Sequence, residues 1–395
     1  MRARWIGVIV GACGLAALGL WALPGAWGVR LELTRGPYVM HPTPTSITIA
    51  WQTNRPVDGR IDFGAGPGYG SAVVEAEPAA RHSVSLTGLA AGTTYAYRVM
   101  GGGRVLAEGH TFRTSLPDGD APFTFAVLGD SGRGNTAQYA VADRLKAIGP
   151  DFVLHTGDVI YPEGEASRFD DRYFRPYRDL IAGIPFFLSL GNHDVMTANG
   201  QAYLDAFDLP SNNPERTKRY YSFDYGNARF IALDSNEDPG PGGPMYAWLA
   251  AELARPRKFW TFAFFHEPPY SSGRHGSNAT LRQAWSPLFE RARVAIVFNG
   301  HDHSYERTVP LRDFDPGGPG VMYVVTGGGG GTLYTVGRSA WTAHSASIHH
   351  VVRVDVRGCA LALQAIASDG AVFDRATIDR CGDRPGPSGP PIRAR

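Results

Sequence analysis

The chain has 395 residues, which is long for a single domain, so two folded units are the natural expectation. Hydrophobic residues make up 43% and charged residues 19% of the sequence, as in a globular protein with a sizeable core. The net charge of +1 lacks the basic excess of a nucleic-acid-binding protein, so nucleic acid is not expected as a partner.

Residues 1–28 have the organisation of an export signal. Arg2 and Arg4 precede an apolar run from Trp5 to Leu23, and a small-residue segment follows it. This order is typical of a secretory signal peptide. The run at residues 5–23 is also long enough to stay in the bilayer as a membrane anchor. The sequence therefore predicts a secreted, periplasmic or extracellular protein, with the signal either cleaved or retained.

Residues 33–116 are predicted to form an all-β domain. Runs such as 46–51 alternate polar and apolar residues, as the strands of a β-sandwich do. A Leu, a Gly turn and then Tyr95 before the strand 96–100 match the tyrosine corner of immunoglobulin-like sandwiches. The segment resembles a fibronectin type III domain and contains no cluster of metal-type residues, so a structural or adhesive role is expected.

After a linker at 115–122, residues 122–380 are predicted to form a layered α/β domain with β-sheets flanked by helices. The expected helices include 136–147, and the apolar runs that predict strands lie at 123–128, 151–155, 185–190, 259–265, 294–298 and 321–325. Two β-like runs, 351–366 and 371–378, predict a hairpin that turns at Asp369-Gly370. The tail 382–395, rich in Pro and Arg, is expected to be disordered.

Cys359 and Cys381 form an even pair in a chain predicted to be exported. In an oxidising compartment such a pair predicts a disulfide, which would close the C-terminal hairpin. Two free buried thiols are the alternative.

Five short motifs each follow the end of an apolar run. They are Gly129-Asp130-Ser131-Gly132, Gly157-Asp158-Val159-Ile160-Tyr161, Gly191-Asn192-His193-Asp194, His266-Glu267-Pro268-Pro269 and Gly300-His301-Asp302-His303. Ligands gather at the carboxyl ends of strands in an open α/β sheet, so the motifs are expected to converge at one edge of the sheet. Each motif alone is consistent with a turn or a helix cap, but five together are not explained that way.

The side chains in these motifs are oxygen and nitrogen donors that suit Fe, Zn, Mn or Mg. Seven donors are too many for one tetrahedral ion, but they suit two ions that share a carboxylate and keep open positions for water. Two such ions can clamp the attacking and leaving oxygens of an in-line displacement at phosphorus. The sequence therefore predicts a two-metal phosphoesterase.

The five motifs, in this order, resemble the calcineurin-like metallophosphoesterases. Two details narrow the resemblance to the purple acid phosphatases. One is Tyr161, three residues after Asp158, and the other is the segment 300–307, which is similar to the family's Gly-His-x-His-x-Tyr-Glu-Arg. The fibronectin-like domain and the glycine-rich segment 326–330 agree with this resemblance, which covers most of residues 33–378.

The resemblance also implies roles for individual residues. It makes Asp130, Asp158, Tyr161 and His303 the ligands of an Fe(3+) ion, with Asp158 as the bridge. It makes Asn192, His266 and His301 complete a second site for Zn, Mn or Fe(2+). The implied catalytic residues are His193, which contacts phosphate or protonates the leaving group, Asp194, which orients it, and His275, a second substrate histidine. His155 is expected to be a core histidine. The sequence leaves the glycines 327–331 unassigned, either as a flexible loop or as backbone whose amides approach phosphate.

The predicted function is that of an acid phosphatase, which hydrolyses small-molecule phosphate monoesters by in-line attack of a metal-bound hydroxide. A phosphodiesterase or nucleotide-cleaving enzyme on the same metal site is the alternative, because the leaving-group pocket lies in loops such as 161–178 and 234–246. Glu267 stands where many relatives carry another His, which leaves the substrate open. A cell-surface binding protein with a vestigial site is a third reading, and the complete ligand set argues against it. The natural substrate, the second metal and the oligomeric state are left open by the sequence.

Overall fold

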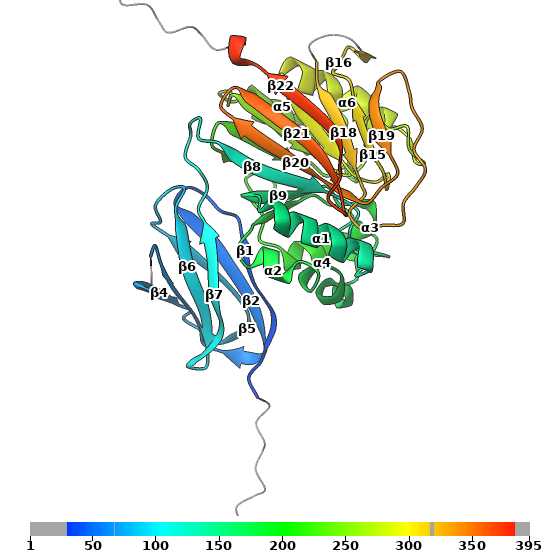
Figure 1. Cartoon of the computed structure of the whole chain (residues 1–395). Helices are drawn as coiled ribbons and strands as arrows, with labels where there is room; N and C mark the ends of the chain where they lie inside the picture. The colour runs from blue at the N-terminus through cyan, green and yellow to red at the C-terminus, as the bar shows by residue number, and fades with distance from the viewer. Residues whose placement is uncertain (1–29, 67, 317–319, 384–395) are drawn as a thin grey trace, which may run out of the picture. The chain divides into compact units, whose positions relative to one another are not determined.

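The computed structural model describes residues 30–66, 68–316 and 320–383 (Figure 1). The predicted export segment and almost all of the predicted disordered tail lie outside these residues. Within the described ranges, no helix is long and apolar enough to cross a membrane.

The N-terminal part is a β-sandwich, as predicted. One sheet has the order β1-β2-β5 and the other the order β4-β3-β6-β7. The strands are β1 (Leu33–Met40), β2 (Ser46–Val57), β3 (Gly59–Gly64), β4 (Ser71–Val74), β5 (Ala79–Thr87), β6 (Thr94–Gly101) and β7 (Arg104–Arg113). Alternate residues along β5 and β6 are buried, so the inner faces of the two sheets share a core that includes Trp51, Leu86 and Tyr97.

The tyrosine corner predicted at Tyr95 is present. The backbone N–H of Ala90 donates a hydrogen bond of 2.9 Å to the Tyr95 hydroxyl. This bond links the start of β6 to the backbone just upstream of it, as in immunoglobulin-like sandwiches.

The α/β part contains two large sheets, of six strands in the order β10-β9-β8-β20-β21-β22 and of seven in the order β11-β12-β13-β14-β18-β15-β19. The first sheet consists of β8 (Phe123–Leu128), β9 (Phe152–His155), β10 (Phe186–Leu188), β20 (His350–Arg357), β21 (Ala360–Ala367) and β22 (Val372–Asp379). The second consists of β11 (Tyr221–Tyr225), β12 (Ala228–Ala232), β13 (Trp260–Phe264), β14 (Ile296–Asn299), β15 (Tyr305–Thr308), β18 (Met322–Thr326) and β19 (Thr342–Ala346). A small hairpin pairs β16 (Leu311–Arg312) with β17 (Asp315–Pro316).

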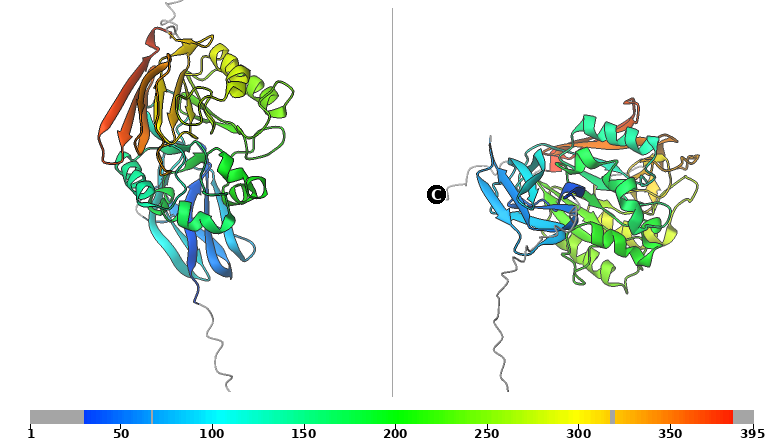
Figure 2. Two further views of the ribbon diagram at one scale, coloured as in Figure 1. Left: turned by 90° about the vertical axis from the view of Figure 1, so that its right-hand side faces the viewer. Right: turned by 90° about the horizontal axis from the view of Figure 1, so that it is seen from below.

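The central strands of the seven-stranded sheet are buried on both faces. In β13, Phe262 and Phe264 pack into the core that the two sheets share, whereas Ala263 packs into a second core with helix residues such as Trp285. Both faces of these strands are therefore apolar, which explains why the sequence shows continuous hydrophobic runs there rather than an alternating pattern. Figure 2 shows the resulting layers of sheet and helix.

The helices are α1 (Thr136–Ile148), α2 (Arg178–Ile181), α3 (Asn192–Val195), α4 (Gln201–Ala206), α5 (Pro244–Ala254) and α6 (Ala279–Arg291), with short turns η1 (Ala166–Arg168), η2 (Asp170–Phe174), η3 (Ala198–Gly200) and η4 (Cys381–Asp383). The predicted helix 136–147 is thus confirmed as α1. Its cap is Asn135, whose side chain accepts a hydrogen bond from the Gln138 N–H.

The C-terminal segment corrects one prediction and confirms another. The run 351–366 is not one strand, because it folds back near Gly358 to give β20 and β21, and β22 then pairs with β21. The predicted disulfide joins Cys359, just before β21, to Cys381, just after β22. It therefore closes the β21–β22 hairpin, whose turn is the predicted one at Asp369-Gly370.

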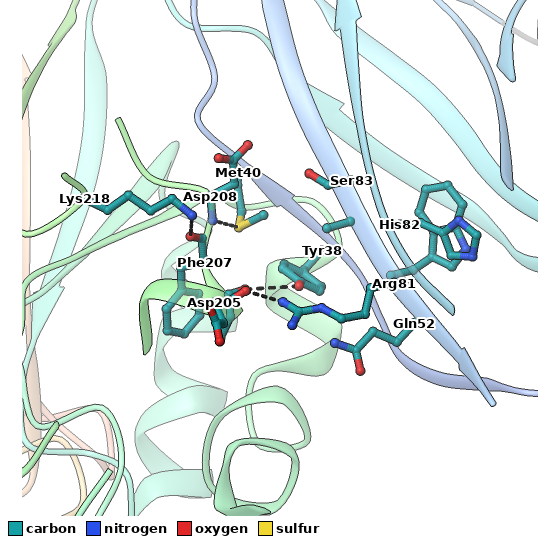
Figure 3. Close-up of a pocket in the computed structure, with 13 residues that line it drawn as sticks. Tyr38, Met40, Gln52, Arg81, His82, Ser83, Asp205, Phe207, Asp208 and Lys218 are labelled. Carbon is teal, nitrogen blue, oxygen red and sulfur yellow. Dashed lines mark hydrogen bonds between the residues drawn. The ribbon is translucent and has the colours of Figure 1, made fainter. Parts of the chain in front are cut away.

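A hollow of about 170 Å³ lies between β2 and β5 of the sandwich and the segment that follows α4 (Figure 3). Some of its polar groups are paired within the protein: Lys218 donates to the carbonyls of Leu204 and Phe207, and Tyr38 donates to the carbonyl of Ala206. The Tyr38 bond joins the sandwich to the α/β part, and among the described residues no metal-type cluster lies at this hollow.

Candidate metal centre

The five motifs converge, but from two sheets rather than one. Three of them follow β8, β9 and β10, which are parallel neighbours in the six-stranded sheet. The other two follow β13 and β14, which are parallel neighbours in the seven-stranded sheet. The expectation of a single sheet edge was wrong because β8–β10 and β13–β14 are buried on both faces and consist of similar apolar runs, so the sequence pattern does not separate the two sheets.

Three of the candidate ligands have a strained backbone. Asp130, Asp158 and His301 have φ values of +59°, +53° and +69°. Residues with a side chain seldom adopt this left-handed region, and when they do they gather at functional sites. The strain lies at the turns where the chain leaves β8, β9 and β14, which is where the side chains must be aimed at a common point.

One set of donors, here called the tyrosine group, consists of Asp130, Tyr161 and His303. The Tyr161 hydroxyl lies 2.7 Å from His303 Nε2 and 3.2 Å from Asp130 Oδ1. His303 Nε2 lies 3.4 Å from the same Asp130 oxygen. Donor atoms of Asp158 also lie within 4.8 Å of those of Asp130 and His303.

A second set, here called the asparagine group, consists of Asn192, His266 and His301. The Asn192 Oδ1 atom lies 2.9 Å from His266 Nε2 and 3.0 Å from His301 Nδ1, and the two nitrogens are 3.2 Å apart. Asp158 Oδ2 lies 3.4 Å from His266 Nε2. Asp158 therefore touches both groups.

These spacings fit two metal ions. Ligands about 2.1 Å from an ion are about 3 Å apart at neighbouring octahedral positions, which is close to the donor separations within each group. The donors are carboxylate, phenol, amide oxygen and imidazole, a set that suits Fe, Zn or Mn. The position of Asp158 between the groups suits a shared ligand.

Backbone carbonyls fix the orientation of two imidazoles. His266 Nδ1 lies 2.9 Å from the Thr156 carbonyl, and His303 Nδ1 lies 2.7 Å from the Thr332 carbonyl. Each Nδ1–H donates to its carbonyl, so each Nε2 is left to face the centre. This second layer of contacts is typical of metal-binding histidines.

The charges around the centre favour a cation. Burial opposes a positive charge on His266, yet the Asp158 and Asp130 carboxylates raise the pKa of this imidazole to about 10. Asp130 and Asp158 are themselves almost completely buried. Two buried carboxylates this close together require positive charge beside them.

The glycine-rich segment 327–331, which the sequence leaves unassigned, is packed against the site. A Cβ on Gly331 would lie 2.7 Å from the His303 ring, and one on Gly327 would lie 2.8 Å from Asp130 Oδ2. The Gly331 N–H donates to the Asp130 carbonyl at 2.7 Å. The glycines are required by the close approach of the backbone to the ligands.

His193 lies beside the tyrosine group. Its ring centroid is 4.7 Å from that of Tyr161, its Nδ1 donates to the Pro162 carbonyl, and its backbone N–H donates to Asp158 Oδ1 at 3.0 Å. Nε2 is thus the ring nitrogen left for a substrate. The catalytic role of His193 stays a prediction.

Asp194 lies behind the site rather than in it. It is buried, and its two carboxylate oxygens accept hydrogen bonds from the N–H groups of Val159, Ile160 and Gly191. These bonds join the loops that carry Asp158 and Asn192. Asp194 therefore positions the loops that carry the ligands. The hydrogen bonds of its carboxylate go to these backbone groups and not to the His193 ring, which it was predicted to orient.

His275 is exposed at the rim of the asparagine group. Its ring centroid lies 4.2 Å from that of His301, and its backbone N–H donates to Asp302 Oδ1 at 2.8 Å. Asp302 is buried and also accepts a hydrogen bond from the Ser271 hydroxyl. The Asp within Gly300–His303 therefore holds the loop that presents His275.

The remaining residues of the segment 300–307 support the fold. Glu306 accepts hydrogen bonds from the backbone and hydroxyl of Ser272. Tyr305 and Arg307 both bind the carboxylate of Asp374 in β22, which ties the two large sheets together.

Two further predictions concern residues near the motifs. His155 is buried at the end of β9, where its Nε2 lies 2.8 Å from the Ser131 hydroxyl and burial lowers the pKa of its imidazole to about 3. It is therefore a neutral core histidine, as expected. Glu267 accepts a hydrogen bond of 2.6 Å from the Asn278 side chain, which caps α6.

Three residues near the site were missed by the sequence reasoning. The Tyr334 ring stacks on His303 with centroids 4.3 Å apart and planes at 9°. The Arg133 guanidinium lies 4.0 Å from the centre of the Tyr161 ring, and that of Arg274 lies 4.9 Å from the centre of the Tyr334 ring. None of them belongs to a recognisable motif. Arg133 directly follows the motif 129–132, and Arg274 directly precedes His275.

Family models match both parts of the chain. The model described as calcineurin-like phosphoesterase matches residues 123–305, and that described as purple acid phosphatase, N-terminal domain, matches residues 34–114. The two matches meet near the linker predicted at 115–122 and cover the sandwich and all five motifs up to Tyr305.

Curated relatives include several plant proteins. Purple acid phosphatase 21 of Arabidopsis thaliana is 29% identical over 263 residues, which cover 63% of this chain and 58% of that protein. An uncharacterized protein of Mycobacterium tuberculosis is 28% identical over 78% of this chain and 70% of its own length. A further relative, 27% identical over 77% of this chain and 58% of its own length, is named "Probable inactive purple acid phosphatase 27" of Arabidopsis thaliana.

Among solved structures, the purple acid phosphatase PPD1 from yellow lupin (Lupinus luteus) seeds aligns with a TM-score of 0.78 and 21% identity, over 87% of this chain and 74% of that one. At this sequence identity, the match shows that the two chains share a fold. The family models, the curated relatives and the shared fold agree with each other. Residues 123–305 therefore match the calcineurin-like phosphoesterase family, and residues 34–114 match the N-terminal domain of the purple acid phosphatases.

Proposed function

We propose that the chain is an exported, metal-dependent phosphatase that hydrolyses phosphate monoesters at a two-metal centre. The observation that carries this proposal is the pair of donor groups, each with donor atoms about 3 Å apart, that share Asp158. The tyrosine group and Asp158 would hold Fe(3+), and the asparagine group and Asp158 would hold Zn, Mn or Fe(2+). When bound, such ions supply Lewis-acid activation of water and of the phosphate oxygens.

The protein's own residues account for the remaining tasks. His193, whose Nδ1–H is held by the Pro162 carbonyl, is suited to transfer a proton at Nε2 to the leaving oxygen. His275 and the half-buried ligands Asn192 and His301 line the open side of the centre, where a substrate can enter. The strained turns at Asp130, Asp158 and His301 hold the ligands in place before any substrate binds.

Export is part of the proposal. The disulfide between Cys359 and Cys381 is of the kind that persists in oxidising compartments. The basic and apolar N-terminal pattern supports the same location.

The proposal is tested by metal analysis and by an assay series on the full chain. We expect two metal ions per chain, a visible absorption band from the Tyr161 phenolate on iron, and faster turnover of nitrophenyl phosphate than of bis(nitrophenyl) phosphate between pH 4 and 9. Faster diester turnover at every pH would favour the phosphodiesterase alternative. Fewer than one bound metal per chain, with no turnover of either ester, would favour a binding protein with a vestigial site.

A further inference from the structure

The ring of Tyr334 covers one face of the ligand His303. The two ring centroids are 4.3 Å apart and the ring planes lie at 9° to each other. The same short segment holds His303 at two further points, because its Nδ1 donates to the Thr332 carbonyl at 2.7 Å and its carbonyl accepts from the Tyr334 N–H at 3.0 Å. The segment 332–334 therefore fixes the plane of the imidazole and the direction in which Nε2 faces.

The same phenol ring contacts the loop that carries His275. The guanidinium carbon of Arg274 lies 4.9 Å from the centre of the Tyr334 ring. The centroid of the His275 ring lies 5.5 Å from that of Tyr334, with the planes at 64°. On its other contact, the His275 ring lies 4.2 Å from that of His301 in the asparagine group. Tyr334 thus joins a ligand of one group to the histidine that borders the other.

Backbone bonds alone do not orient the side chain of His275. Its N–H donates to Asp302, and the Ser272 carbonyl accepts from the Gly337 N–H, so these bonds fix the path of the loop. The His275 side chain is exposed, and an exposed side chain that is not held samples several rotamers. Aromatic rings prefer stacked or edge-to-face contacts, so a neighbouring ring restricts these rotamers. Tyr334 is such a neighbour.

We propose that Tyr334 is a positioning residue that orients two histidines at once, the metal ligand His303 and the substrate-facing His275. The inference rests on the proposed function and adds to it a residue that lies outside all five motifs. The Tyr334 hydroxyl makes no hydrogen bond to another described residue, so the flat ring itself carries the role.

Two variants separate the ring from its hydroxyl. Tyr334→Leu removes the flat ring, whereas Tyr334→Phe keeps it, and both are expected to fold because Tyr334 is only half-buried. We expect Tyr334→Leu to lower kcat/KM for nitrophenyl phosphate by about tenfold and to weaken retention of the ion in the tyrosine group by about tenfold, as the loss of supporting contacts does. Tyr334→Phe should behave as the wild type. Tyr139→Leu, at a residue of α1 that is 39% exposed, is the matched control.

The link to His303 has a spectroscopic readout. In the iron-loaded chain, Tyr334→Leu should shift or broaden the visible absorption band, because the imidazole is free to rotate. Tyr334→Phe and Tyr139→Leu should leave the band unchanged.

The link to His275 has a readout that needs no metal. Amide hydrogen exchange of the segment 271–278 in the metal-free full chain reports how firmly this loop is held. Tyr334→Leu should speed the exchange in this segment, and Tyr334→Phe should restore the slow exchange of the wild type.

A double-mutant cycle then tests whether Tyr334 acts through His275. The values of kcat and KM are measured for Tyr334→Leu, for His275→Ala and for the two together. If the ring orients His275, the loss of kcat/KM in the double variant is smaller than the product of the two single losses, because part of the effect of Tyr334 needs His275 to be present.

Each result has a definite meaning. Losses that multiply in the cycle, or unchanged exchange in the segment 271–278, would overturn the link to His275. An unchanged band with full retention of the ion would overturn the link to His303. Equal losses in Tyr334→Phe and Tyr334→Leu would overturn the role of the ring in favour of the hydroxyl. If the loaded wild type hydrolysed no phosphate ester, the proposed function would fail, and exchange in the metal-free chain would still decide whether Tyr334 holds the loop.

Discussion

The tyrosine group and the asparagine group differ in how the fold supports them. Asp130, Tyr161 and His303 are at most 3% exposed, and the packed segment 327–331 and the ring of Tyr334 lie behind them. In the asparagine group only His266 is fully buried, while Asn192 and His301 are half-buried. The two groups share Asp158 but not the same surroundings.

The difference suggests a division of labour between the two ions. Donors that are buried and backed by a rigid layer are suited to retain an ion and to hold its geometry. Donors that reach the surface are suited to hold an ion that exchanges with solvent and that receives a substrate. We therefore expect the ion in the tyrosine group to be the permanent one and the ion in the asparagine group to be the exchangeable one.

The largest effect is expected at the residue that both groups share. Asp158→Asn removes the charge that would bridge the ions, and activity should fall by roughly a thousandfold because positioned electrostatic stabilisation is lost. Metal analysis should show loss of at least one ion. The matched control is Asp313→Asn, at an exposed position. Asp302→Asn is unsuitable as a control, because Asp302 holds the loop of His275. Near-normal turnover in Asp158→Asn would contradict the shared role.

The next prediction compares one ligand from each group. Tyr161→Phe should abolish the visible absorption band while the ion in the asparagine group is retained. His301→Ala should do the reverse, keeping the band and losing the exchangeable ion. Each change should weaken binding of its own ion by about tenfold to a hundredfold or more, since even supporting contacts have effects of that size. Spectra and metal analysis on the same samples check both; loss of both ions in both variants would show that the groups are not separable.

A smaller effect is expected behind the tyrosine group. Gly331→Ala would place a methyl group against the His303 ring, and overpacking of this kind costs about 1–3 kcal/mol of unfolding free energy. The absorption band should weaken or shift, because His303 must move. Gly242→Ala, where a Cβ meets nothing within 4 Å, is the matched control for thermal unfolding and for the spectrum. Equal unfolding temperatures and equal spectra in the two variants would show that the segment 327–331 can shift to accommodate the methyl group.

The smallest expected effect is one of rate. During dialysis against a chelator, the ion in the asparagine group should leave first, because two of its protein donors reach the surface. Activity should then decay while the absorption band persists. Metal content, activity and absorbance followed over the same time course give the order, and simultaneous loss of all three signals would count against a permanent and an exchangeable ion.

Much of the molecule was predictable because its signals are local. The alternation in β5 and β6, the corner at Tyr95 and the cap of α1 at Asn135 each depend on residues close together in the sequence. The five motifs were also visible, since each places a donor at the end of an apolar run, in four of them directly after a glycine. Their assignment to individual ions rests on the resemblance to a family and is still untested.

Other features depended on contacts between distant segments. The run 351–366 has a strand-like pattern on both sides of Gly358, and Gly358 is the only turn signal within it. The sequence does not assign the glycines 327–331, and they are packed because His303 and the distant Asp130 lie against them. Asp194 reads as a partner of the neighbouring His193, but its carboxylate binds the backbone of the Asp158 loop.

The sequence by itself thus determined the two kinds of domain, the disulfide pair and the set of donor residues, because periodicity, cysteine count and strand-end motifs are properties of short segments. The tertiary structure decided that the donors come from two sheets, that they fall into two groups around Asp158, and that the Tyr334 ring stacks on His303. These facts follow from the packing of β8–β10 against β13 and β14, which brings together side chains that no local pattern relates.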